Sequence, residues 1–189
     1  MKKKTNPNKI PRSLCPEAVQ SQISEAIRQQ LFVAWASFLA ATASLKSSTH
    51  DSILELWKVI NNYPNRMMHK SQAQLILNQM EEITGFPSTI TTVDISSIQS
   101  QQDLKLALSA IRKNSFLISL SMIAEPILAL HLYDEETLYR LWRRTLSYGE
   151  DIHNGRIKLK DIQKILVDEY QIHLCFTLTG VSLKIQNTA

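Results

Sequence analysis

Apolar side chains recur every three or four positions along most of this chain, which predicts amphipathic helices. The longest such stretch predicts a helix over about residues 16–46 with one buried stripe. The stripe consists of Val19, Ile23, Ile27, Leu31, Ala34, Trp35, Phe38 and Leu39. The same spacing predicts a second helix over residues 53–60, which stops near Pro64, and a third over residues 71–84. Gly85 then stands where a left-handed C-cap would end that third helix.

The second half of the chain repeats this order of predicted helices. A long helix begins near Ser100 and must kink or end at Pro126, because the proline ring removes a hydrogen bond and clashes with the preceding turn. Another helix follows Asp134, and a last one covers about residues 160–170. The two sets together predict a mainly helical fold.

Short β-branched and alternating runs complete the predicted elements. Residues 89–95 are rich in threonine, isoleucine and valine, which predicts a strand. Near the C-terminal end, alternating runs at 172–178 and 181–185 flank Thr179-Gly180, which predicts a β-hairpin. The predicted fold class is therefore mainly α with a small antiparallel β element, an α+β arrangement.

Three pairs of segments match between the two halves, at spacings that grow from 84 to 87 positions. The pairs are 27–32 with 111–116 (Ile-Arg-x-x-x-Phe), 56–57 with 141–142 (Leu-Trp) and, more loosely, 79–83 with 166–170. A period this long predicts two folded units, since solenoids repeat every 20 to 50 residues.

This repeat predicts the organisation of the chain. We expect an extended arm at residues 1–16, a first three-helix unit at 17–98, and a second at 99–189 that ends in the hairpin. Units of about 85 residues are only marginally stable alone. We therefore expect the two to pack face to face as one pseudo-two-fold monomer, or to exchange partners in a homodimer.

Positive charge is concentrated in the predicted arm. The chain has 189 residues and a net charge of +4, but residues 17–189 carry 16 basic and 17 acidic side chains. The cations of the arm are Lys2, Lys3, Lys4, Lys9 and Arg12. A nearly neutral body argues against a broad nucleic-acid-binding face on it. The arm itself can neutralise phosphates without base specificity, or serve as a solubility tail.

Cysteine usage and hydropathy predict a cytoplasmic location. Cys15 and Cys175 are far apart, so they do not form a disulfide framework. The basic start has no apolar stretch behind it, which argues against a signal peptide. Residues 31–43, the most apolar stretch, are too few to span a bilayer, so no membrane partner is expected.

No local motif indicates catalysis, a cofactor or a metal. The four glycines are scattered, whereas a phosphate-binding loop needs them clustered. His173 and Cys175 share one face of a predicted strand, but a structural zinc site needs four ligands. Trp57 and Trp142 lie in apolar stripes, so core packing is favoured over a role as stacking platforms. We expect a protein that is not an enzyme.

One predicted helix carries three arginines. Arg140, Arg143 and Arg144 can form a solvated face or a basic patch against nucleic acid or an acidic protein surface. Arg140 can also pair with Glu136 at the i,i+4 spacing, which is worth only a few tenths of a kcal/mol.

Three segments together carry a resemblance to a family. The segments are Lys4 to Pro11, Arg140 to Trp142, and Asp161 to Ile172. They resemble small, mostly uncharacterised proteins encoded by prophages and mobile elements of Gram-positive gut bacteria, over about half of the chain. This chain departs from that pattern at Gln171, where the family tends to have glycine, and in its apparent duplication. The first copy also shows Glu82-Ile83 in place of the Glu-Tyr pair.

The resemblance implies a phage setting, and it shapes two functional hypotheses. The first is a non-enzymatic phage-encoded binding protein that docks onto a host protein and inhibits it, for example a CRISPR nuclease in the manner of an anti-CRISPR. The second is a DNA- or RNA-binding regulator that uses the basic arm and the Arg140–Arg144 helix. An enzyme is the third and least favoured class.

Overall fold

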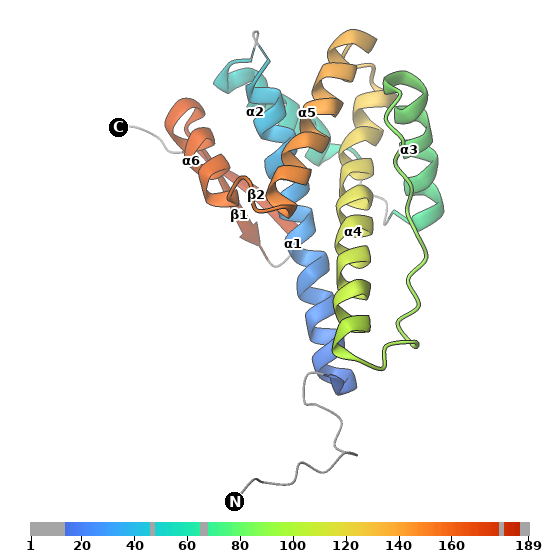
Figure 1. The fold of residues 1–189 in the computed structure, drawn as a ribbon. Helices are drawn as coiled ribbons and strands as arrows, with labels where there is room; N and C mark the ends of the chain where they lie inside the picture. Colours follow the sequence, from blue (N-terminus) through green and yellow to red (C-terminus); the bar gives the residue numbers. More distant parts are fainter. Residues whose placement is uncertain (1–13, 46–47, 65–67, 178–179, 186–189) are drawn as a thin grey trace, which may run out of the picture.

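The computed structural model describes residues 14–45, 48–64, 68–177 and 180–185 (Figure 1). These contain six helices: α1 (Pro16–Ala43), α2 (His50–Asn62), α3 (Lys70–Thr84), α4 (Gln101–Ala129), α5 (Glu135–His153) and α6 (Leu159–Tyr170). Strands β1 (Ile172–Thr177) and β2 (Gly180–Ile185) pair antiparallel, with Ile172 opposite Ile185. The mainly helical class is confirmed.

Local capping chemistry fixes where several helices begin and end. Thr49 and Ser100 cap α2 and α4 by accepting hydrogen bonds from backbone N–H groups three residues on, and Asp134 does the same for α5. Gly85 ends α3 in the left-handed region, with φ of 70°, as predicted. Pro126 lies in the last turn of α4, which ends three residues later.

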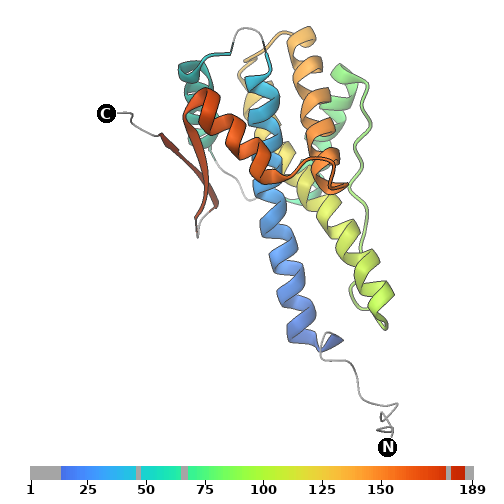
Figure 2. The same ribbon diagram turned by 60° about the vertical axis from the view of Figure 1, so that its left-hand side comes forward.

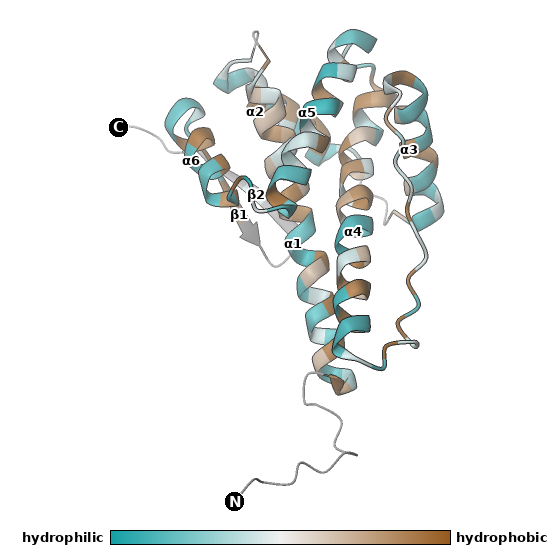
Figure 3. Ribbon diagram, viewed as in Figure 1, coloured by the Kyte–Doolittle hydropathy of each residue, from teal (hydrophilic) through white to brown (hydrophobic). Residues whose placement is uncertain are grey.

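Two long helices form the centre of the molecule. α1 and α4 lie side by side and run in the same direction in both views (Figures 1 and 2). α5 and α6 pack on α1, while α3 packs on the other side of α4. Every residue of α1 from Phe32 to Ala43 is buried, so this half of the helix has no solvent-facing side. Figure 3 shows the apolar residues gathered where the helices meet.

All three tryptophans belong to this core, which confirms the packing interpretation over the stacking one. Trp35, Trp57 and Trp142 are each less than a tenth exposed. The rings of Trp35 and Trp57 lie 4.3 Å apart, centre to centre, and join α1 to α2. Aromatic side chains of this size dominate the free energy of a small core.

The N-terminal halves of α1 and α4 project beyond the core (Figures 1 and 2). We call residues 16–30 of α1 and 101–112 of α4 the two-helix extension. A separate small apolar cluster holds it together; its buried members are Ile23, Ala26, Leu104, Leu108 and Ile111. Ile27 was predicted to be buried with them, and this was wrong: it is 48% exposed, because the extension has only one helix for α1 to pack against.

The strand predicted at residues 89–95 is wrong. The chain from Phe86 to Asp94 has no regular secondary structure and runs alongside α4 toward the tip of the extension (Figure 1). Its threonines and isoleucines favour an extended backbone, but an extended segment becomes a strand only when another strand bonds to it. None of the described segments does so here.

Two side-chain amides take the place of that missing strand. Gln74 of α3 donates to Ser88 O at 2.9 Å and accepts from Ile90 N at 2.9 Å. Asn114 of α4 donates to Thr91 O at 2.9 Å and accepts from Thr91 N at 3.0 Å. A primary amide offers one donor and one acceptor side, as a peptide group does, so each can satisfy an extended backbone. Residues 88–91 are thereby fixed between α3 and α4.

The order of helices repeats between the halves, but the packing does not repeat equally. α5 packs along much of α1, whereas α2, its counterpart in the repeat, meets α4 only over a short stretch. Ile27 is half exposed while its counterpart Ile111 is buried. Pseudo-two-fold symmetry therefore stays a prediction.

By length and composition alone, α4 is the one described helix that could span a membrane. Core helices of soluble bundles can meet the same criterion, and 39% of the most apolar stretch of α4 is buried by its neighbours. This property therefore carries little weight by itself.

Candidate functional site

The arginines of α5 do not form an open basic patch. Arg140 pairs with Glu136 one turn earlier, as the spacing predicted, and both side chains are exposed. Arg144 donates from Nη1 to Ser44 O at 2.7 Å and to Ser44 Oγ at 2.6 Å, at the C-terminal end of α1. Arg143 is exposed and has no ion pair among the described residues. Two of the three guanidinium groups therefore already serve intramolecular contacts.

The other predicted binding residues lie outside the described part of the chain. These are Lys2, Lys3, Lys4, Lys9 and Arg12. Cys15 is half-buried at the N-cap of α1, and Cys175 is half-buried on β1 beside His173. Within the described ranges, no three His, Cys, Asp or Glu side chains gather closely enough to hold a metal ion.

Sequence reasoning missed a cleft between α4 and the C-terminal end of α5. Its volume is about 540 Å³, and residues 87–89 form a third wall. From α4 it is lined by Ser109, Arg112, Lys113, Phe116 and Leu117, which recur at helical spacing. From α5 and its C-cap it is lined by Leu146, Glu150, His153 and Asn154. We call this the α4–α5 cleft.

A glycine sets the distance between the two helices at this cleft. Gly149 of α5 is buried directly on the ring of Phe116. A Cβ atom at position 149 would lie 2.8 and 2.9 Å from Cε2 and Cε1 of Phe116, and closer still to Cζ. Real Cβ atoms essentially never approach so closely, so glycine is what allows α5 to approach α4 here.

His153 connects the cleft to α1. Its ring stands edge-on to Phe116, with centres 5.3 Å apart, and its Nε2 lies 2.6 Å from Oε1 of the buried Gln30. The pKa of His153 is lowered from its ordinary value of 6.5, mainly because burial of part of the ring disfavours the charged form and secondarily because of the Arg112 guanidinium. A hydrogen bond to the Gly149 backbone acts weakly in the opposite direction. The partly buried site therefore favours the uncharged imidazole.

Basic side chains outnumber acidic ones in the lining of the cleft. Glu150 is engaged by Arg156, whose Nη2 lies 3.4 Å from Oε1, and Asn154 donates to the same oxygen at 3.4 Å. Arg112 and Lys113 have no ion pair among the described residues. The cleft thus carries two cations without an ion pair among the described residues, one carboxylate and an apolar floor.

A wider hollow at the start of α3 is a weaker candidate for a binding site than the α4–α5 cleft. Its volume is about 700 Å³, but it is open to solvent and its cation is already engaged. Lys70 donates to Thr91 O at 3.2 Å and to Thr92 Oγ1 at 3.1 Å. This hollow is best understood as the outer side of the fixed segment 88–91.

The two-helix extension is the second candidate. It exposes large apolar side chains: Ile27 of α1 is 48% exposed and Leu106 of α4 is 61% exposed. Leu106 borders a shallow hollow of about 300 Å³ that Val93 and Ile98 also line. Ile95, in the adjoining segment, is 46% exposed.

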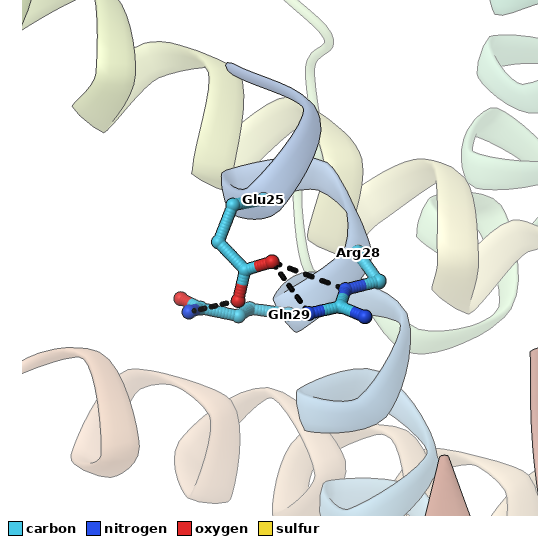
Figure 4. A network of polar contacts seen from close by, with 3 residues as sticks. All are labelled: Glu25, Arg28 and Gln29. Atoms are coloured by element: carbon cyan, nitrogen blue, oxygen red, sulfur yellow. Dashed lines mark hydrogen bonds and ion pairs between the residues drawn. The ribbon is translucent and has the colours of Figure 1, made fainter. Parts of the chain in front are cut away.

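A polar network of Glu25, Arg28 and Gln29 lies on the surface of α1 (Figure 4). Arg28 donates to Glu25 Oε2 from Nε at 3.1 Å and from Nη2 at 2.7 Å, while Gln29 donates to Oε1 at 2.8 Å. The hydrogen bond from Gln29, followed by that from Arg28, lowers the pKa of Glu25. Both carboxylate oxygens are thereby bound within α1.

Comparison with known proteins adds no relationship: no family model, curated protein or solved structure matches this chain.

Proposed function

We propose that this protein is a non-enzymatic binding protein that docks through the two-helix extension onto a partner protein. The observation that carries this proposal is the exposure of Ile27 and Leu106 on the two-helix extension and of Ile95 in the adjoining segment. Single exposed apolar residues are ordinary, but several on one narrow projection are typical of an interaction surface.

The mechanism proposed is steric. A standard interface buries about 800 Å² on each partner, so the extension would cover a patch that another molecule needs to reach. The body behind it, with its core of α1, α4 and α5, would then block access to the neighbouring surface.

We further propose a bacterial host protein as the partner, with inhibition of a defence nuclease such as a CRISPR nuclease as the concrete version. This version rests on the resemblance to prophage and mobile-element proteins in Lys4 to Pro11, Arg140 to Trp142 and Asp161 to Ile172. It places the protein in the cytoplasm of the bacterial host.

A matched pair of variants tests the docking surface. Ile27 on the extension and Ile165 on α6 are the same residue type, both lie inside helices, and both are 48% exposed. Full-length wild-type, Ile27→Asp and Ile165→Asp proteins would each capture partners from host lysate at micromolar concentration, with mass spectrometry as the readout. We expect a protein retained by wild type and Ile165→Asp and lost with Ile27→Asp. Equal capture by both variants, or no protein captured by wild type, would refute the docking proposal.

The repeat supports a related proposal on assembly. The two halves, 17–98 and 99–189, would be copies of one helical unit, packed within a monomer or exchanged between two chains. The shared helix order and the matched Leu-Trp pairs support it. Sedimentation velocity separates the two arrangements, since only the exchanged one gives a stable dimer.

A nucleic-acid-binding regulator is the second candidate. It is favoured by the five cations among residues 2–12 and by the exposed, unpaired Arg143 among the described residues. Phosphate contacts of this kind weaken steeply as salt rises. Gel-shift titration of DNA and RNA over a salt series tests it, with a variant lacking residues 1–12 as the comparison. Binding that survives this deletion and ignores salt would exclude a role for the arm.

A further inference from the structure

The α4–α5 cleft has the charge of an anion site. Arg112 and Lys113 are adjacent on α4, both line the cleft, and no described carboxylate lies within ion-pair distance of either. The acid in the lining, Glu150, lies 3.4 Å from Arg156, which binds Asp151 more closely, at 2.7 Å. Two cations and one carboxylate leave the lining with a net positive charge. Unpaired cations on the wall of a concave, partly apolar cleft raise the local positive potential and concentrate anions there.

The floor and the size of the cleft indicate more than an inorganic ion. Phe116 and Leu117 are buried beneath it, and Leu146 is half-buried at its side. Its volume of about 540 Å³ falls in the range of clefts that enclose small organic ligands, about 300–1,000 Å³. An inorganic anion would fill only the charged part of the cleft and would leave the apolar side chains of its floor without a ligand contact.

The third wall is fixed before any ligand arrives. Gln74 holds Ser88 O and Ile90 N, and so sets the position of residues 87–89 relative to α3. The side chains of Ser88, Thr89 and Ser109 add hydroxyl groups to the lining, which can donate to anion oxygens. A wall that need not be ordered on binding reduces the entropic cost of association.

We propose that the α4–α5 cleft binds a small organic anion, a carboxylate or phosphate ester attached to an apolar body. Arg112 and Lys113 contact the anionic group, and Phe116, Leu117 and Leu146 contact the apolar body. Ser109 and Arg112 belong to the two-helix extension, but the exposed apolar residues Ile27, Ile95 and Leu106 do not line the cleft. Ligand binding and partner docking can therefore be tested with separate variants.

Fluorescence titration of the full-length chain with 8-anilinonaphthalene-1-sulfonate tests this site, because that dye is an anion on an aromatic body. Arg112→Gln removes one cation, and Lys105→Gln, an exposed cation of α4 outside the cleft, is its matched control. Ser109→Trp places a large side chain in the cleft. Because Ser109 is exposed, this substitution should leave the fold intact. Circular dichroism establishes that each variant is folded.

We expect saturable one-to-one binding by wild type and Lys105→Gln, about tenfold weaker binding by Arg112→Gln, and none by Ser109→Trp. Displacement by adenosine monophosphate identifies a phosphate ester on a flat ring, and displacement by octanoate identifies a carboxylate on an aliphatic chain. The proposal is overturned if wild type shows no saturable binding up to about 1 mM dye. It is also overturned if Arg112→Gln and Ser109→Trp titrate like wild type, or if neither competitor displaces the dye.

Discussion

Replacing Gly149 with alanine tests the contact that sets the separation of α4 and α5. Inside a helix, glycine to alanine normally stabilises a protein by about 1 kcal/mol. Here the new Cβ would lie within 3 Å of three carbons of the Phe116 ring, which is only 5% exposed. The ring must move or the helices must separate. Because the ring is buried, we expect an overpacking cost in the upper part of the typical range, about 2–3 kcal/mol before the usual gain is subtracted. We expect a net loss of about 1–2 kcal/mol in the free energy of unfolding.

Urea denaturation followed by circular dichroism measures this loss, since the midpoint shifts while the slope stays constant. Ser147→Ala, an exposed position on the same helix, is the control and should leave the free energy of unfolding within about 0.5 kcal/mol of wild type. The double variant Gly149→Ala with Phe116→Leu should recover part of the loss, because leucine leaves room for the Cβ atom. The two substitutions would then be coupled in a double-mutant cycle. A Gly149→Ala protein as stable as wild type would refute the close-approach argument.

Three further outcomes follow from described contacts. The pKa of His153 is lower in the folded protein than in the unfolded chain, so the unfolded state binds the proton first as pH falls. The free energy of unfolding should therefore fall as pH drops below 6.5. His153→Gln should reduce that pH dependence in urea titrations. Gln74→Ala should cost about 1–3 kcal/mol and speed hydrogen exchange at residue 90, whereas Gln79→Ala, an exposed position on the same helix, should do neither. Arg144→Ala should lower the free energy of unfolding by about 1 kcal/mol through loss of its bonds at the end of α1, with Arg143→Ala nearly neutral in thermal melts.

Local chemistry made much of the helical fold predictable. Ser100 and Asp134 begin their helices because a short polar side chain can accept from the free N–H groups of a first turn, and Gly85 ends α3 because it tolerates positive φ. Trp57 and Trp142 could be assigned to the core from their place in an apolar stripe. These features depend only on neighbours within a few residues.

The errors occur where distant parts of the chain decide the outcome. The spacing of apolar residues places Ile27 on a stripe, but it cannot reveal that the rest of the bundle ends before that position. The β-branched run at 89–95 correctly indicates an extended backbone, yet nothing local shows that Gln74 and Asn114, rather than a strand, bond to it.

The α4–α5 cleft could not be predicted from the sequence for the same reason. Arg112 and Lys113 stand in a motif that the repeat had already drawn attention to, at helical spacing with Phe116. That they line one cleft with residues of α5 and residues 87–89, however, depends on the packing of segments far apart in the sequence. Nor does the sequence indicate that Arg144 is engaged at Ser44, 100 positions away.

The common direction of α1 and α4 has an electrostatic consequence at the tip of the extension. Peptide dipoles of parallel neighbours add, so two partial positive poles, each equivalent to roughly half an elementary charge, stand next to each other there. Glu17 and Asp103 occupy the first turns of the two helices, and each carboxylate offsets the pole of its own helix. Antiparallel neighbours would need no such compensation. Neutralising both acids would leave the two positive poles uncompensated, and the tip would then attract negatively charged groups.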